Sequence, residues 1–335
     1  MDMEQEDMQY LGFFGVCREA YKIIHSWRKV FSQITLALVL PLSFILLAHM
    51  EVSEVLFSKI IHNEMVLGET KTGTPRYQKL SDVLRSELIT LWLFKAVYLI
   101  FSLIFSLLST SAVVYTIACI YTGREVVTFE KVMSVVPKVW KRLMLTFLCT
   151  FVAYLAYNIV AALILVASGA FIISINIKYL SLLYVLVVFY ILGFVYLSIV
   201  WQLANAVTVL EDTWGFHALR KSRALLKGKM WVATFILLLV NLCHFAIQIS
   251  FEKLVVRGGS LGAASRFAYG IICLVLLFML LLSGLVLRTV IYFVCKSYHH
   301  ENIDKSALSD HLAGYYIGEY VPLKSKDVQL EHLYV

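Results

Sequence analysis

Long apolar runs alternate along the chain with short segments that hold most of its charged residues. Six of these runs have about the 20 apolar residues with which a helix crosses a bilayer core. They lie near residues 34–50, 94–121, 143–173, 180–210, 230–251 and 267–295. The pattern predicts an all-α fold, a polytopic transmembrane helical bundle of about six spans. Pro41 is expected to kink the first span, and the long third and fourth spans must tilt or extend past the hydrocarbon.

Basic amphipathic segments precede the first, third and fifth spans, at residues 14–31, 128–143 and 216–231. Each ends on a Trp with Lys or Arg where the next apolar run begins. Apolar residues recur at helical spacing in each, as with Phe14, Cys17, Tyr21 and Ile24 in the first. We expect three cytoplasmic interfacial helices whose basic faces meet anionic lipid headgroups. The alternative is ordinary basic loops. The order also suggests three similar units of one interfacial helix and two spans.

The basic residues predict the orientation. Nineteen Lys and Arg lie on the side of the two chain ends and nine on the other, with Lys95 at a helix end. Positively charged loops stay in the cytosol, so both termini are expected there. The domains expected are a cytosolic segment at 1–33, a six-span domain at 34–295 and a cytosolic tail at 296–335.

Composition agrees with a membrane protein. Of 335 residues, 60% are hydrophobic and 15% charged, and the mean hydropathy is +0.81, which a soluble globule cannot hide in its core. The net charge of +7 comes from residues that flank the spans, so no nucleic acid is expected as a partner. None of the six cysteines lies in a predicted exoplasmic segment, which indicates free thiols. The polar, acidic N-terminus does not resemble a signal peptide, so the first span is expected to be the targeting signal.

Two families resemble parts of this pattern. The Trp-Lys-Arg segments ahead of hairpins are similar to the membrane module of bacterial glycerophosphodiester phosphodiesterases, over about residues 90–295. The motifs WQLANAVTVLED at 201–212 and AGYYIGEYVPLKSKDVQLE at 313–331 resemble a land-plant family of uncharacterised six-span membrane proteins, sometimes called polyadenylate-binding-protein-binding proteins. That resemblance implies a multi-pass protein of the plant secretory system. Neither implies catalysis, because the hydrolase domain of the phosphodiesterases has no counterpart here.

Polar residues inside the apolar runs are the best candidates for a site. The fifth span carries them at spacings of three, four and four, which keeps them on one helical face. The candidates are Asn241, His244, Gln248 and Glu252 in the fifth span, Gln202 and Asn205 in the fourth, and Asn158 in the third. They should point into the bundle. They either bond helix to helix or line a polar pocket or path for a small solute or lipid headgroup. Arg288, inside the sixth run, is expected to snorkel toward cytosolic phosphates.

Short motifs on the cytosolic side suggest regulation. Residues Tyr320 to Leu323 fit a tyrosine-based sorting signal for a cytosolic adaptor, as do residues 10–13. Cys17 and Cys295 lie at the expected membrane face, where S-acylation is possible. No metal-ligand spacing, nucleotide loop or nucleophile motif occurs, so we expect no catalytic residue, metal or cofactor.

The sequence therefore favours a non-enzymatic integral membrane protein that organises or traffics membrane components through its cytosolic face. Its expected location is the endoplasmic reticulum and secretory pathway or the plasma membrane. The alternative is a transporter or lipid-handling protein that uses the polar stripe of the fifth span.

Overall fold

The computed structural model describes residues 8–71, 73–122, 128–175, 180–211, 213–259 and 262–300. All regular elements in these ranges are helices, and six are long and apolar enough to cross a membrane. They run over Arg28–Glu69, Pro75–Tyr121, Phe129–Ser168, Tyr184–Leu210, Met230–Val256 and Ala263–Tyr298. The predicted all-α fold class with six candidate spans is confirmed, and the chain is a multi-pass membrane protein.

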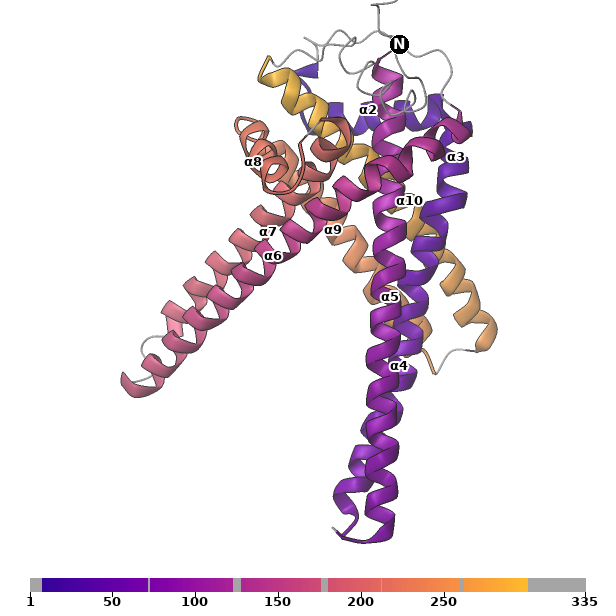
Figure 1. Cartoon of the computed structure of the whole chain (residues 1–335), viewed down its shortest axis with the longest axis vertical. Helices are drawn as coiled ribbons and strands as arrows, with labels where there is room; N and C mark the ends of the chain where they lie inside the picture. Colours follow the sequence, from indigo (N-terminus) through magenta and orange to yellow (C-terminus); the bar gives the residue numbers. More distant parts are fainter. Residues whose placement is uncertain are drawn as a thin grey trace, which may run out of the picture.

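The long helices form three hairpins, each made of two helices that follow one another in the chain (Figure 1). The pairs are α4 (Leu40–Glu69) with α5 (Pro75–Tyr121), α6 (Phe129–Ile175) with α7 (Leu180–Leu210), and α9 (Met230–Phe251) with α10 (Ala263–Tyr298). Three short helices, α2 (Phe13–Ser26), α3 (Arg28–Ile34) and α8 (Phe216–Leu225), lie at the end of the bundle where the described chain begins. We call this end the N-terminal face.

The basic segments form a protein-packed cap on the N-terminal face. Helices α2 and α8 are separate, as expected, but residues 128–143 continue directly into the third span within α6. Val132, Val136 and Val139 of that segment are buried against the bundle. In α2 the buried face holds Val16, Ala20 and Ile23, whereas Phe14 and Tyr21 of the predicted stripe are exposed. Tertiary packing therefore buries the predicted apolar face of residues 128–143, whereas in α2 it buries a different face from the predicted one.

A π-helical turn, η1 (Thr35–Val39), stands just before Pro41. Proline has no N–H to donate, and its ring clashes with the carbonyl four residues earlier. A wider turn relieves that clash and is a common response inside long helices. The distortion expected from Pro41 is present as this widened turn.

The first hairpin continues well beyond the predicted spans. Charged residues begin at Glu51 in α4 and end at Lys95 in α5, so the tip of the hairpin lies outside the hydrocarbon. From Glu51 to Glu69 an α-helix rises about 27 Å. The Thr74 side chain accepts a bond from the Tyr77 amide at 3.3 Å and caps α5. Asn63 Nδ2 donates to Glu87 Oε2 at 2.8 Å, which joins the two helices.

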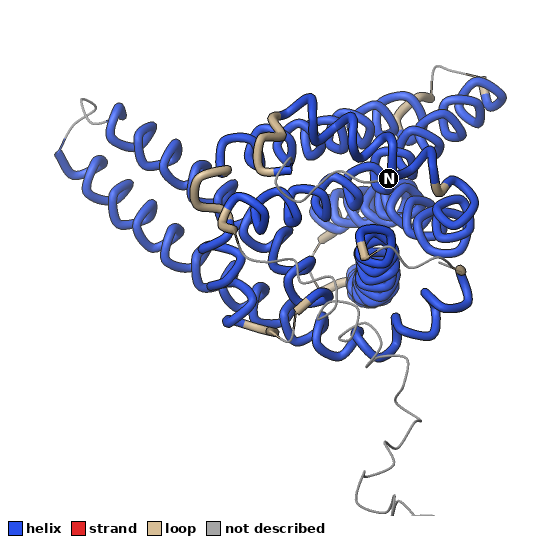
Figure 2. The backbone as a smooth tube through the Cα atoms, turned by 90° about the horizontal axis from the view of Figure 1, so that it is seen from above, coloured by secondary structure: helices blue, strands red, loops and turns tan. Residues whose placement is uncertain are grey.

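The α6/α7 hairpin runs obliquely away from α4 and α5 (Figure 1), and the view onto the N-terminal face shows it extending to one side (Figure 2). Helix α7 has 31 residues, or about 46 Å of helix. This is longer than a hydrocarbon core of about 30 Å requires, so α7 must tilt or extend past the hydrocarbon. We call this pair the oblique hairpin.

The main hydrophobic core lies toward the N-terminal face, where helices of all three hairpins meet. Its largest fully buried side chains include Phe31, Leu203, Tyr292 and Phe293. Away from this core the oblique hairpin and the first hairpin diverge. The divergence leaves a wedge between the hairpins, and the candidate site lies there.

Candidate functional site

A cavity of about 330 Å³ lies between α4, α5, α7, α9 and α10, and we call it the inner cavity. Leucines from α4, α5 and α10 form most of its apolar wall. Its polar members are Ser102, Ser106, Ser109, Asn205, Asn241, His244 and Arg288. A cavity with apolar walls and a few converging polar groups is the usual form of a ligand site.

Among the described residues, Arg288 is the only Lys or Arg that lines the inner cavity. It lies eight residues before Lys296 on α10, about 12 Å deeper along the helix axis. The sequence favoured a snorkelling arginine, but the side chain lines the cavity, and its Nε is buried without a hydrogen-bond partner among the described residues. A guanidinium stays charged and needs acceptors, so the cavity is suited to an anionic group.

The neighbouring wall also carries polar atoms without partners. Trp201 Nε1, Gln202 Oε1 and Asn205 Oδ1 are buried and accept or donate no hydrogen bond within the described residues. A second cavity of about 520 Å³, the side cavity, lies between α6, α7 and α9. It shares Phe147, Trp201 and Asn241 with the inner cavity. Because buried polar groups are normally hydrogen-bonded, this wall is suited to a ligand with donors and acceptors.

A third cavity of about 260 Å³, the outer cavity, lies between α4, α5 and the residues that follow α9, farther from the N-terminal face than the inner cavity. Its polar lining consists of His49, Ser53, Glu54, Lys95 and Glu252. Glu252 begins the π-helical turn η3 (Glu252–Val256) and pairs with Arg257 at 2.9 Å. This cavity is close to the level at which α4 and α5 become charged, so it lies near the membrane surface.

The predicted polar residues are thus divided among three cavities. Asn205, Asn241 and His244 come together in the inner cavity, with Gln202 and Asn241 in the side cavity. Glu252 lines the outer cavity, and Gln248 lies on α9 between His244 and Glu252.

Asn158 has a different role from the rest of the stripe. Its Oδ1 accepts a bond from Tyr190 Oη at 2.9 Å, and its Nδ2 donates to the Tyr154 carbonyl at 2.8 Å. Tyr157 Oη donates to the Tyr190 carbonyl at 2.8 Å. These bonds join α6 to α7, so Asn158 follows the helix-to-helix interpretation.

Sequence reasoning did not identify the contribution of α5. Ser102, Ser106 and Ser109 recur at spacings of four and three, which places them on one face. That spacing was a usable signal. Ser106 Oγ donates no hydrogen bond within the described residues and faces the cavity, whereas Ser109 Oγ donates to the Phe105 carbonyl.

The sorting-motif and acylation candidates differ in whether the structure describes them and in how exposed they are. Tyr320 and Leu323 lie outside the described residues. Cys295 is fully buried, so its thiol is out of reach of an acylating enzyme in this conformation. Cys17 is partly exposed on α2, and burial raises the pKa of its thiol.

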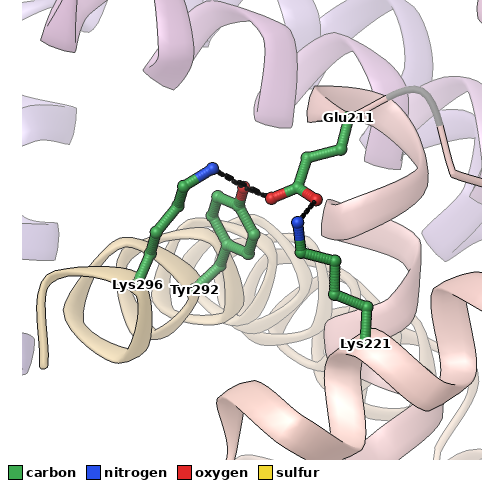
Figure 3. A network of polar contacts seen from close by, with 4 residues as sticks. All are labelled: Glu211, Lys221, Tyr292 and Lys296. Atoms are coloured by element: carbon green, nitrogen blue, oxygen red, sulfur yellow. Dashed lines mark hydrogen bonds and ion pairs between the residues drawn. The ribbon is translucent and has the colours of Figure 1, made fainter. Parts of the chain in front are cut away.

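A polar network fastens the end of α7 to α8 and α10 at the N-terminal face (Figure 3). Glu211 accepts bonds from Tyr292 Oη at 2.6 Å and Lys296 Nζ at 3.0 Å, and it pairs with Lys221. Burial alone would raise the pKa of the Glu211 carboxyl, but the three partners outweigh it and hold the pKa below its usual value. Glu211 is therefore a carboxylate, and it fixes the inner cavity's helices at this end.

No group of three or more His, Cys, Asp or Glu residues capable of holding a metal ion occurs in the described part of the chain. What the arrangement offers is one arginine, neutral donors and acceptors, and apolar walls open to the bilayer. These groups can bind and orient an anionic amphiphile.

Comparison with known proteins gives one match. A family model described as a domain of unknown function, DUF8558, matches residues 1–333. The comparison with curated proteins finds no match, and neither does the comparison with solved structures.

Proposed function

Because this match spans nearly the whole chain, the protein belongs to the DUF8558 family, and we propose that it is a lipid-handling membrane protein that binds the anionic headgroup of a lipid in the inner cavity. One observation carries the proposal: Arg288 lines a cavity inside the membrane with Asn205, Asn241 and His244, and its Nε has no partner among the described residues. An arginine at this depth is unfavourable unless an acceptor meets it.

The lipid is argued from the surroundings of Arg288. Phe151, Phe194 and Leu238 line the adjoining side cavity and have large exposed surfaces. In a membrane these surfaces face acyl chains. A phosphate or carboxylate at Arg288 with its chains in the side cavity fits both the charge and the apolar walls.

The orientation belongs to the same proposal. Helices α3 and α8 place Arg28, Lys29, Arg220 and Arg223 on the N-terminal face. By the distribution of basic loops this face is cytosolic, in a secretory or plasma membrane, where its surface also attracts anionic headgroups. Ligand then enters the inner cavity from the cytosolic leaflet. The role in organising or trafficking other components through an adaptor depends on the tail at 301–335, outside the described residues, so the cavity favours lipid handling.

Retention of lipid by the purified protein tests the proposal. Wild type, Arg288→Met, Arg288→Lys and Arg220→Met are mixed in detergent with phosphatidic acid or phosphatidylcholine, and native mass spectrometry counts the lipids retained. Arg220 is an exposed residue of α8 that lines none of the three cavities, so its variant controls for surface binding.

We expect wild type and Arg220→Met to retain phosphatidic acid preferentially. Arg288→Met should bind it about 10-fold to 100-fold more weakly, because a charge-assisted hydrogen bond contributes about 1.5–3 kcal/mol. Arg288→Lys should fall between them. Equal retention of phosphatidic acid by Arg288→Met and wild type would refute the proposal.

A further inference from the structure

The inner and outer cavities share helices α4 and α5, and the outer cavity is also lined by Glu252 and Val256 of η3, which continues α9. On α4 the inner cavity ends at Leu46 and the outer begins at His49. On α5 the corresponding residues are Leu99 and Lys95. Three or four helical residues rise about 4.5–6 Å, so little more than one turn of helix separates the two cavities.

Helix α9 provides a polar connection across this gap. His244 lines the inner cavity and Glu252 the outer, with the half-buried Gln248 one turn from each. Residues four apart share a face, so Gln248 lies on the same face of the helix as His244 and Glu252. The stripe on α9 therefore continues from one cavity to the other.

An aromatic stack of α4 and α5 lies at the level between the two cavities, since Tyr98 falls between Lys95 of the outer cavity and Leu99 of the inner cavity. The His49 ring stacks on Tyr98 with ring centroids 3.7 Å apart, and on Phe94 at 5.8 Å. His49 also exchanges a hydrogen bond with Ser53 at 3.2 Å. The barrier thus consists of side chains from α4 and α5, which can change rotamer without movement of the helix backbones.

Each end of this line has one cation suited to an anionic group. Arg288 is at the inner end. At the outer end Lys95 is exposed and makes no ion pair with a carboxylate among the described residues, while its ammonium lies 6.0 Å from the centre of the Trp92 ring. Arg257 pairs with both acids of the outer cavity, Glu54 at 3.6 Å and Glu252 at 2.9 Å. It thereby offsets part of their repulsion of an anion, and Lys95 supplies the second positive charge.

We propose that the inner and outer cavities are the two ends of one path along which a phosphate-bearing anion crosses the bilayer, and that the stack of His49 on Tyr98 closes this path in the present conformation. The proposal rests on the proposed function, since Arg288 is the inner binding group. Leu99, Ser106 and Asn241 are exposed beside the path. A headgroup can therefore move along it while its acyl chains stay in the membrane.

The test uses the full chain in proteoliposomes and compares two sources of the anion. One arm follows acyl-labelled NBD-phosphatidic acid, whose label is quenched by external dithionite once the lipid reaches the outer leaflet. The other follows efflux of trapped inorganic phosphate. The variants are Tyr98→Ala, Arg288→Met and, as a matched control, Phe101→Ala, an exposed aromatic on α5 outside the cavities.

We expect Tyr98→Ala to move lipid at least fivefold faster than wild type, Phe101→Ala to equal wild type, and Arg288→Met to fall to the rate of protein-free vesicles. Accelerated phosphate efflux without lipid movement also supports the path and identifies a free anion as the cargo.

The path is refuted if Tyr98→Ala accelerates neither process while the same preparation still retains phosphatidic acid through Arg288. In that case the binding site stands. Loss of Arg288-dependent retention in the wild type would instead refute the proposed function, and the path with it.

Discussion

At the scale of single residues, two charged groups with different surroundings define this protein. Glu211 is almost enclosed but has three partners, so its charge holds α7, α8 and α10 together. Arg288 has no comparable set among the described residues. A charge with full partners is structural, whereas a charge without them in a cavity is available to a ligand.

Replacement of Glu211 by Gln should destabilise the protein by about 2 kcal/mol at pH 7, since two lysines then lose their carboxylate. Thermal unfolding in detergent measures the effect. The pKa of Glu211 is lowered in the folded state, so its contribution is fully present above its unfolded value, near 4.5. That contribution is lost as the pH falls through the lower folded pKa.

The difference in Tm between wild type and Glu211→Gln should accordingly be constant from about pH 7 to 5 and shrink at lower pH. A Tm difference that grows as the pH falls would contradict a lowered pKa of Glu211 in the folded state. Because Tm depends on scan rate when unfolding is irreversible, both proteins are scanned at one rate in the same detergent.

Gly228 shows how backbone conformation constrains a residue. Its φ is +91°, and an added Cβ would lie 2.2 Å from Cε1 of the Tyr298 ring. Gly228→Ala should cost about 1–3 kcal/mol through left-handed strain and overpacking, seen as a lower Tm. Gly12→Ala, where a Cβ meets nothing within 4 Å, is the control. Equal Tm values for the two variants would show that the close approach is unimportant.

At the scale of helices, the sequence predicts where the bilayer lies better than where the helices end. Hydropathy marks only the hydrocarbon portion, so residues 34–50 were expected where α4 continues to Glu69. The extension is stabilised by local bonds such as Asn63 with Glu87, which no hydropathy pattern contains. Pro137 similarly lies inside α6, although a proline there suggests a boundary.

The candidate site was predictable to the same limited extent. Spacing on α9 was enough to bring Asn241 and His244 to one face. Their meeting with Arg288 depends on how hairpins distant in sequence pack, which the spacing within one helix does not specify. Asn158 illustrates the opposite case, because its partner Tyr190 belongs to the next helix of its own hairpin.

The oblique hairpin offers a test of packing between its helices. A Cβ on Gly193 of α7 would lie 2.3 Å from Tyr157 Oη of α6. Gly193→Ala should displace Tyr157, break its bond to the Tyr190 carbonyl and lower stability by about 1–3 kcal/mol. Gly270→Ala, in the interior of α10 with open space around its Cβ, should be neutral or raise Tm slightly. The measurement is thermal unfolding, and a stabilised Gly193→Ala would contradict the packing described.

At the scale of the whole molecule, the N-terminal face and the tip of the first hairpin lie at opposite ends (Figure 1). In a background without the six native cysteines, and with the protein directed to the plasma membrane, Lys71→Cys at the tip should react with a membrane-impermeant maleimide added outside intact cells. Arg220→Cys in α8 should react only after permeabilisation. Reversed labelling would place the N-terminal face outside and invert the direction of ligand entry.

The length of α7 also makes the protein responsive to its host membrane. Because the apolar length of a helix is fixed, the helix tilts less in a thicker bilayer and more in a thinner one. A smaller tilt would bring the oblique hairpin toward α4 and α5 and compress the inner cavity between them, while a larger tilt would widen it. Endoplasmic-reticulum and plasma membranes differ by about 5 Å in hydrocarbon thickness, so the same molecule would hold its ligand more loosely in one compartment than in the other.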